Sequence, residues 1–136
     1  GLSLSWMIEG MDADSKLISV DNDPALISIA SSYFGDDDRV EVICKDGTDW
    51  IKEYSGSKFD LIFADAWPGK YSVIDEVLDL LKVGGFYIID DMTKQPNWPD
   101  GHEDNVITLT AYLEERNDLQ LTKMNWSTGL IMAVKI

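Results

Sequence analysis

The fold class follows from residues 59–65, which read Phe59-Asp60-Leu61-Ile62-Phe63-Ala64-Asp65. Most side chains of this short run are apolar, and the run ends at an acidic residue, as a buried strand of a parallel sheet often does. Similar runs lead to Asp21, Asp46 and Asp90. The sequence therefore predicts four strands, at residues 17–20, 40–44, 59–64 and 86–89.

Helical segments alternate with these runs. Asp23-Pro24 is typical of a helix start, with Asp23 as the cap and proline in the first turn. A short helix is expected at 48–54, and apolar residues spaced i, i+3, i+4 and i+7 predict a helix over 74–81 that Val83-Gly84-Gly85 ends. A polar loop over 93–105 leads to a last helix, whose core face we expect to be Val106, Leu109, Thr110 and Leu113.

Repeated alternation of strand and helix predicts an α/β fold of the Rossmann-like, doubly wound type with a mostly parallel sheet. Two final strands, at 119–126 and 130–136, are joined by Ser127-Thr128-Gly129 and form a hairpin that adds one antiparallel strand. Residues 1–136 are expected to form a single domain.

Composition and charge narrow the function. Eleven Lys and Arg residues against twenty-five Asp and Glu residues give a net charge of −14, which disfavours nucleic-acid and membrane-surface partners. Cys44 is the only cysteine, so no disulfide forms within the chain and a cytoplasmic location is expected. We expect Cys44, in its strand, to be buried, and Trp6 to belong to the core.

The aspartates that follow the strands suggest a binding site. Ligands of open parallel sheets bind beyond the carboxyl ends of the strands, where Asp21, Asp46, Asp65 and Asp90 are expected to gather. Ribose hydroxyls, an adenine amino group, a sulfonium or a divalent metal would each offset their charge. The simpler alternative is that aspartate is common after strands as a turn former and helix cap.

Asp21 is the most informative of the four, because an acidic residue at a strand end in this fold is the usual acceptor for ribose hydroxyls. In a dinucleotide-binding enzyme it would follow the first glycine of a Gly-rich loop by about twenty residues. A nucleotide-dependent oxidoreductase of the Rossmann group is therefore an alternative interpretation. The Asp90-Asp91 pair and the closing hairpin argue against it.

Five motifs in order resemble the class I S-adenosylmethionine-dependent methyltransferases, in particular the small O-methyltransferases related to catechol and caffeoyl-CoA methyltransferases. They are Gly1-Leu2-Ser3, Ile18-Ser19-Val20-Asp21, Asp46-Gly47, Phe59–Ala66, and Leu81–Gly85 with Ile88–Asp91. The resemblance implies methyl transfer from S-adenosylmethionine to a hydroxyl group of a small-molecule acceptor. The cofactor-binding residues that it implies are Gly1, Ser3, Asp21, Asn22, Asp46, Gly47, Asp65 and Trp67.

Metal-dependent members of this family hold one divalent cation with an aspartate after the third of these strands and an Asp-Asn pair after the fourth. The matching residues are Asp65, Asp90 and Asp91, and Mg²⁺ or another divalent cation would suit their oxygens. Asp91 replaces the family's asparagine. A third carboxylate still suits a hard cation, but the replacement also fits a site that binds no metal.

The catalytic candidates are Asp65, Lys70 and His102. The family's catalytic lysine lies two residues before Lys70, where this chain has Pro68, so Lys70 is either the displaced base or a solvated lysine at a helix start. His102 is the only histidine, and it is either a general base or a surface residue that caps the last helix. Trp67 and Trp98 either stack on a ligand or cover the sheet edge.

The resemblance also implies that the first, central strand of the sheet and its glycine loop are missing from the chain. A sheet without its middle strand exposes unpaired backbone groups, so we expect a homo-oligomer. A third interpretation follows from the same observation. The chain is then a non-catalytic assembly module with a methyltransferase fold.

Overall fold

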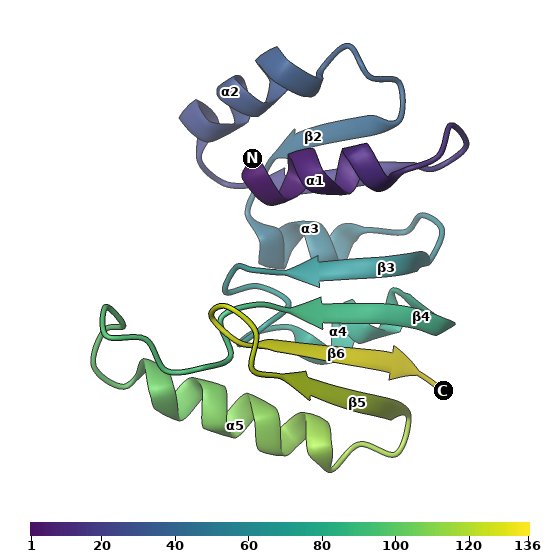
Figure 1. Cartoon of the computed structure of the whole chain (residues 1–136). Helices are drawn as coiled ribbons and strands as arrows, with labels where there is room; N and C mark the ends of the chain where they lie inside the picture. The colour runs from purple at the N-terminus through teal and green to yellow at the C-terminus, as the bar shows by residue number, and fades with distance from the viewer. The chain divides into compact units, whose positions relative to one another are not determined.

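The computed structural model describes all 136 residues, and helices alternate with strands along the chain until the closing pair of strands (Figure 1). The chain divides into two units, Gly1–Glu53 and Tyr54–Ile136. The first holds α1 (Leu2–Gly10), β1 (Leu17–Asp21), α2 (Pro24–Phe34), β2 (Val40–Cys44) and α3 (Gly47–Glu53). The second holds β3 (Phe59–Ala64), α4 (Ile74–Asp79), β4 (Leu81–Ile89), α5 (His102–Glu114), β5 (Leu119–Met124) and β6 (Leu130–Lys135).

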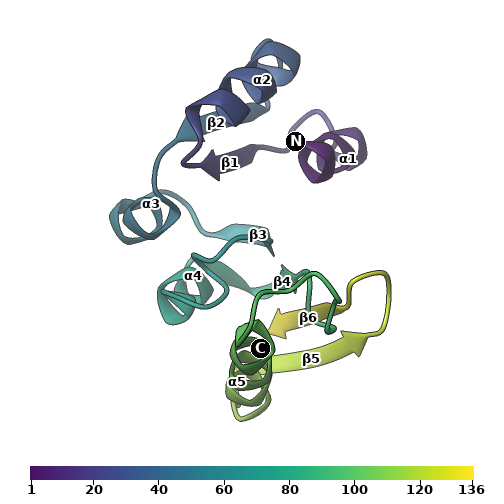
Figure 2. The ribbon, with the colours of Figure 1, turned by 90° about the vertical axis from the view of Figure 1, so that its left-hand side faces the viewer.

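The first unit is built around a parallel pair of strands. β1 and β2 pair with Leu17 opposite Val40 and Asp21 opposite Cys44. The Asp23 carboxylate accepts hydrogen bonds from the backbone N–H groups of Ala25 and Leu26, so it caps α2 as its sequence predicts. Helix α2 packs against β2 (Figure 2).

The second unit has a four-stranded sheet in the order β3-β4-β6-β5. β3 and β4 are parallel, while β6 is antiparallel to both β4 and β5. The closing hairpin therefore contributes one antiparallel strand, as predicted, and this strand lies between β4 and β5. The α/β fold and the element order are confirmed, although β1 and β3 each pair on one side only and the strands form two sheets.

The predicted helix over 74–81 ends early. Helix α4 stops at Asp79 and β4 begins at Leu81, so the glycines lie inside a strand. Phe59 pairs with Leu81 and Leu61 with Phe86, so β4 carries the extra residues of a bulge. Gly84 has φ +81°, a conformation that glycine adopts without strain, which explains why the bulge forms there.

The last helix begins earlier than predicted. Gly101, at φ 82°, precedes the first residue of α5, which is His102, so the predicted loop 93–105 ends four residues sooner. Val106, Leu109 and Leu113 are buried, as their spacing predicts. The largest fully buried side chains of the second unit are Tyr87, Leu78, Leu81, Ile89 and Leu113. No helix has the length and apolar character needed to span a bilayer.

Two predictions about burial are wrong. Cys44 is exposed, because it is the last residue of β2, which pairs with β1 alone. Trp6 is 72% exposed, and Leu4 is the only buried residue of α1. Helical spacing alone does not show which face of a short terminal helix packs against the rest of a protein.

Candidate functional site

Two carboxylates of the second unit lie at one edge of its sheet. Asp65 follows Ala64 at the end of β3, and Asp90 follows Ile89 at the end of β4. Ala64 and Ile89 are register partners, and the Asp90 N–H donates to the Ala64 carbonyl at 3.2 Å. The parallel register therefore brings these strand ends together, as predicted. We call Asp65, Asp90 and Asp91 the acidic rim.

The carboxylate of Asp90 is held by two protein donors. Its Oδ1 accepts from the Asp91 N–H at 2.7 Å and from Oγ1 of Thr128 at 3.0 Å. Thr128 reaches Asp90 because residues 92 and 93 bond the hairpin turn: the Met92 N–H donates to the Gly129 carbonyl and the Thr93 N–H to the Thr128 carbonyl. The sequence marked 127–129 only as a turn, so this contact was not predicted.

Lys70 contacts the backbone of the acidic rim. Its side chain is 4% exposed, and Nζ donates to the Asp90 carbonyl at 2.5 Å and is 3.5 Å from the Asp91 carbonyl. The interpretation of Lys70 as a solvated lysine is wrong. Its Nζ is bonded to main-chain carbonyl oxygens and does not form an ion pair within 4.0 Å of any carboxylate.

Charge and burial oppose each other at this point. Burial raises the pKa of Asp65, and the negative charges of Asp90 and Asp91 raise it further, while Lys70 acts in the other direction. Burial lowers the pKa of Lys70, and all three carboxylates favour its charged form. Burial has the larger effect on Lys70, so its pKa is lowered even though these carboxylates favour the ammonium.

Aromatic side chains surround His102. Its ring centroid is 4.5 Å from that of Trp98, 5.4 Å from that of Tyr71 and 6.4 Å from that of Trp67. The Tyr71 hydroxyl lies 3.2 Å from His102 Nε2, and burial raises the pKa of Tyr71 to about 12. This hydroxyl stays protonated at neutral pH and can donate to the imidazole.

The first unit contains the other predicted acidic residues. Asp21, at the end of β1, is exposed, and its Oδ1 accepts from the Asp23 N–H at 2.8 Å. The Asp46 carboxylate accepts from the N–H groups of Thr48 and Asp49 at 2.8 and 3.1 Å, so it caps α3. Asp46 therefore acts as a helix cap, which is the simpler alternative given for these aspartates. Only its Oδ1 is engaged in the cap, so Oδ2 can still bind a ligand.

The remaining cofactor-binding candidates lie where short elements begin or end. Gly1 and Ser3 lie at the start of α1, Asn22 follows β1, Gly47 begins α3, and Trp67, 54% exposed, lies in the loop after β3. Tyr71 and Thr128 are contributors to the site that the sequence did not single out. Tyr71 directly follows the catalytic candidate Lys70, but no spacing rule linked it to His102.

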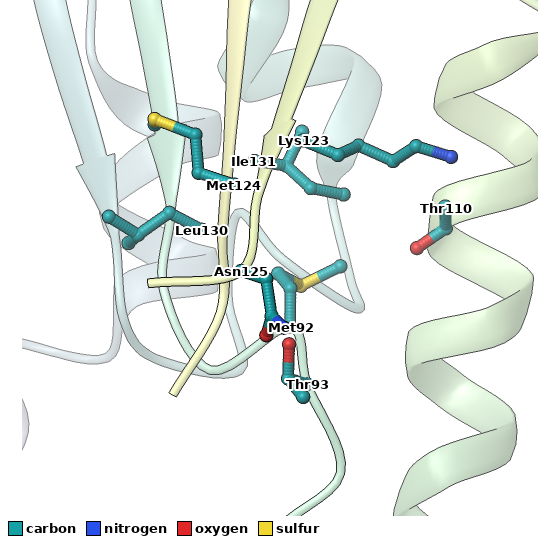
Figure 3. A pocket seen from close by; sticks show the side chains of 8 residues that line it. All are labelled: Met92, Thr93, Thr110, Lys123, Met124, Asn125, Leu130 and Ile131. Atoms are coloured by element: carbon teal, nitrogen blue, oxygen red, sulfur yellow. The ribbon is translucent and has the colours of Figure 1, made fainter. Parts of the chain in front are cut away.

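A cavity of about 280 Å³ opens elsewhere in the second unit. In Figure 3 its lining side chains come from helix α5, the hairpin strands β5 and β6, the start of the turn between them, and the segment after β4. They are Met92, Thr93, Thr110, Lys123, Met124, Asn125, Leu130 and Ile131. None of the predicted site residues lines it, so this cavity is distinct from the candidate site.

Known proteins with the same fold bind the predicted cofactor. The O-methyltransferase TomG from Streptomyces achromogenes, solved in complex with SAM, has a TM-score of 0.83 at 22% identity over 99% of this chain and 68% of its own. An O-methyltransferase from Bacillus cereus, in complex with SAH, has a TM-score of 0.82 at 21% identity over 100% of this chain and 70% of its own. At these identities the likeness shows a shared fold.

Sequence comparison gives the family. A Mycobacterium leprae (strain Br4923) protein whose name assigns it to the O-methyltransferases is 27% identical over 94 residues, which are 65% of this chain and 42% of that protein. The chain thus matches less than half the length of this curated relative. A sequence model described as O-methyltransferase matches residues 1–134. The chain belongs to the O-methyltransferase family.

Proposed function

We propose that the chain supports methyl transfer from S-adenosylmethionine to a hydroxyl group of a small molecule. The observation that carries the proposal is the family match over 1–134, together with Asp65 and Asp90 in register at the ends of parallel strands. Ligands of such folds bind beyond these strand ends. That the acceptor group is a hydroxyl is itself part of the proposal, because the chain covers only part of the length of its relatives.

The cofactor-binding residues fit an adenosyl group by their chemistry. Asp21 is exposed at the end of β1, and a carboxylate there accepts hydrogen bonds from ribose hydroxyls. Asp46 and Gly47 begin α3, and exposed Trp67 offers a ring face. Gly1 and Ser3 at the start of α1 and Asn22 beside Asp21 complete the proposed set.

S-adenosylmethionine supplies a sulfonium-bound methyl group when it is bound. The chain's own part is to align the acceptor and to take its proton, and alignment supplies much of the rate enhancement in such transfers. His102 is the proposed base. Its Nε2 contacts the Tyr71 hydroxyl, and Trp98 packs against its ring. The proton is proposed to pass through this hydroxyl, which takes up the acceptor's proton as it gives its own to Nε2.

Asp65 and Lys70 complete the proposed catalytic set. Asp65 directly follows the end of β3. The family resemblance implies that methyl donor and acceptor meet at this strand end. The Lys70 ammonium, at the carbonyls of Asp90 and Asp91, would favour the anionic form of an acceptor oxygen close to it. Because Lys70 is buried and bonded to carbonyl oxygens, we assign the proton transfer to His102.

The divalent cation implied by the resemblance does not fit these residues. No group of three or more His, Cys, Asp or Glu side chains in the structure could hold a metal ion. The Asp90 carboxylate already accepts two hydrogen bonds, and the Lys70 ammonium lies against the carbonyls of Asp90 and Asp91. The proposed mechanism therefore uses no metal.

Self-association and a cytoplasmic location stay predictions. Large apolar side chains of α1 and α2 are exposed, and a second copy of the chain would shield them: Leu2, Trp6, Leu26, Ile29 and Tyr33. Sedimentation velocity at increasing protein concentration tests this prediction. A monomer at every concentration would contradict it.

The experiment that tests the proposed function is a calorimetric titration with S-adenosylhomocysteine. Saturable binding is expected for the wild-type chain, with affinity reduced at least tenfold in Asp21→Asn, because a lost charged hydrogen-bond acceptor costs about 1.5–3 kcal/mol. Asp14→Asn removes an equal charge from the loop before β1 and serves as the control. Equal affinity in the two variants would contradict the role of Asp21.

A further inference from the structure

Lys70 is the only charged side chain of the chain that is buried, with 4% of its surface exposed. A lysine is rarely buried to this degree unless its charge is matched by nearby groups. Here Nζ donates to one main-chain carbonyl oxygen at 2.5 Å and lies 3.5 Å from a second. Both carbonyls belong to the segment that carries Asp90 and Asp91.

The loop before α4 fixes this lysine in place. Its backbone turns back on itself, with the Tyr71 N–H donating to the Trp67 carbonyl at 2.9 Å and the Gly69 N–H to the Ser72 carbonyl at 2.8 Å. Gly69 itself is buried and adopts φ 80°, which a side chain would disfavour. The backbone hydrogen bonds of the loop therefore determine the position of Lys70.

Lys70 Nζ contacts the backbone of two of the three residues that the resemblance assigns to a divalent cation. The charges of Asp65, Asp90 and Asp91 all act on it, and it acts on Asp65 in return. A divalent cation placed among these carboxylates would be repelled by the ammonium, and this repulsion is strong where water is excluded. Two donors already engage Asp90 Oδ1.

We propose that the ammonium of Lys70 is the resident cation of the acidic rim and replaces the divalent metal there. Lys70 is then a positioning residue that holds the strand end at Asp90 and Asp91 and offsets part of the charge of the three carboxylates. The inference rests on the proposed function for the use of the site. The presence or absence of a metal site can be measured without any methyl transfer.

The direct test is Mn²⁺ binding followed by electron paramagnetic resonance, with the metal alone added to the full chain in 0.15 M salt, which screens the weak attraction of Mn²⁺ to a protein of charge −14. The wild-type chain is expected to bind no stoichiometric Mn²⁺ at millimolar metal, and its unfolding temperature should not respond to Mg²⁺ or EDTA. A Mn²⁺ site in the wild-type chain that Asp90→Asn abolishes would overturn the proposal.

Variants at Lys70 supply the second arm. Lys70→Ala removes the cation and should gain one bound Mn²⁺ per chain, with an unfolding temperature that now rises on addition of Mg²⁺. Lys70→Arg keeps a cation and should gain none. Lys82→Ala removes an exposed lysine, the partner of Asp60, and is the matched control. A folded Lys70→Ala chain without a Mn²⁺ site would overturn the proposal; if this variant does not fold, the wild-type measurement decides.

Titration of the same samples with S-adenosylhomocysteine separates the two claims. A wild-type chain that binds S-adenosylhomocysteine and no Mn²⁺ supports both the proposed function and the role of Lys70. A chain that binds neither contradicts the proposed function, while the absence of Mn²⁺ binding still supports Lys70 as the resident cation. A chain that binds both contradicts the role of Lys70 alone.

Discussion

The Tyr71 hydroxyl lies 3.2 Å from Nε2 of His102, the only imidazole of the chain. Because burial raises the pKa of Tyr71 to about 12, the hydroxyl keeps its proton at neutral pH and can donate it in a hydrogen bond to Nε2 of a neutral His102. We therefore predict that neutral His102 carries its proton on Nδ1. Nitrogen-15 NMR of the single histidine reports this tautomer directly.

The matched variant is Tyr71→Phe, which keeps the ring beside Trp67 and His102 and removes only the hydroxyl. We expect the Nδ1-protonated form to lose its dominance in this variant, because the free Nε2–H tautomer is then no longer disfavoured. An unchanged tautomer ratio would show that Tyr71 does not orient the base.

A second prediction concerns Thr128, whose Oγ1 donates to the Asp90 carboxylate at 3.0 Å. Thr128→Val keeps the shape of the side chain and removes the donor. Because hydrogen bonds to charged groups are stronger than neutral ones, the free energy of unfolding should fall by about 1–2 kcal/mol. Urea denaturation measures it. Thr108→Val, which removes a hydrogen bond to the Asp104 carbonyl on the exposed side of α5, should cost less.

A third prediction concerns Tyr87 in the core of the second unit. Its hydroxyl is buried without a hydrogen-bond partner, and burial raises the pKa of the side chain. Tyr87→Phe removes an unsatisfied polar group and retains the ring, so the free energy of unfolding should stay constant or rise by up to about 1 kcal/mol. A loss of stability in urea denaturation would mean that the hydroxyl has a partner in solution.

A fourth prediction is a pH dependence of stability in the first unit. Hydrogen bonds from Arg39 lower the pKa of Asp37 from 3.8 to about 2. A carboxyl whose pKa is lowered by folding stabilises the fold above its unfolded pKa, and this contribution is lost as the pH falls from about 4 to about 2. Asp37→Asn should therefore destabilise the chain at pH 6 and have little effect at pH 2.

The control for this prediction is Asp36→Asn, which removes the same charge from the same turn. The urea midpoint of each variant is compared with that of the wild-type chain at both pH values. An equal loss for Asp37→Asn at pH 6 and pH 2 would exclude the carboxylate–guanidinium contact as the cause.

The sequence predicted the parts of the fold that depend on local pattern. The strand that leads to Asp65 and the cap at Asp23 form as predicted, because apolar runs and helix caps act within a few residues. The bulge at Gly84 and the early start of α5 at His102 were not predicted. They depend on how β4 aligns with β3 and on the αL conformation of Gly101, which no local pattern specifies.

The sequence likewise predicted some features of the site and missed others. Parallel register explains why Asp65 and Asp90 lie at one edge, and this followed from the order of strands alone. The burial of Lys70 did not, because it depends on a loop closed by its own backbone hydrogen bonds. The contact between Thr128 and Asp90 joins residues 38 positions apart, and no spacing rule in the sequence predicts it.

The central claim is that the proposed residues bind S-adenosylhomocysteine, the product that S-adenosylmethionine leaves after methyl transfer. The most direct measurement is a two-dimensional amide NMR spectrum of the nitrogen-15-labelled chain during titration with S-adenosylhomocysteine. We predict saturable shifts at Asp21, Asn22, Gly47 and Trp67, and none at Lys123 and Met124, which line the separate cavity. A spectrum that does not change up to millimolar ligand, or shifts confined to that cavity, would contradict the account.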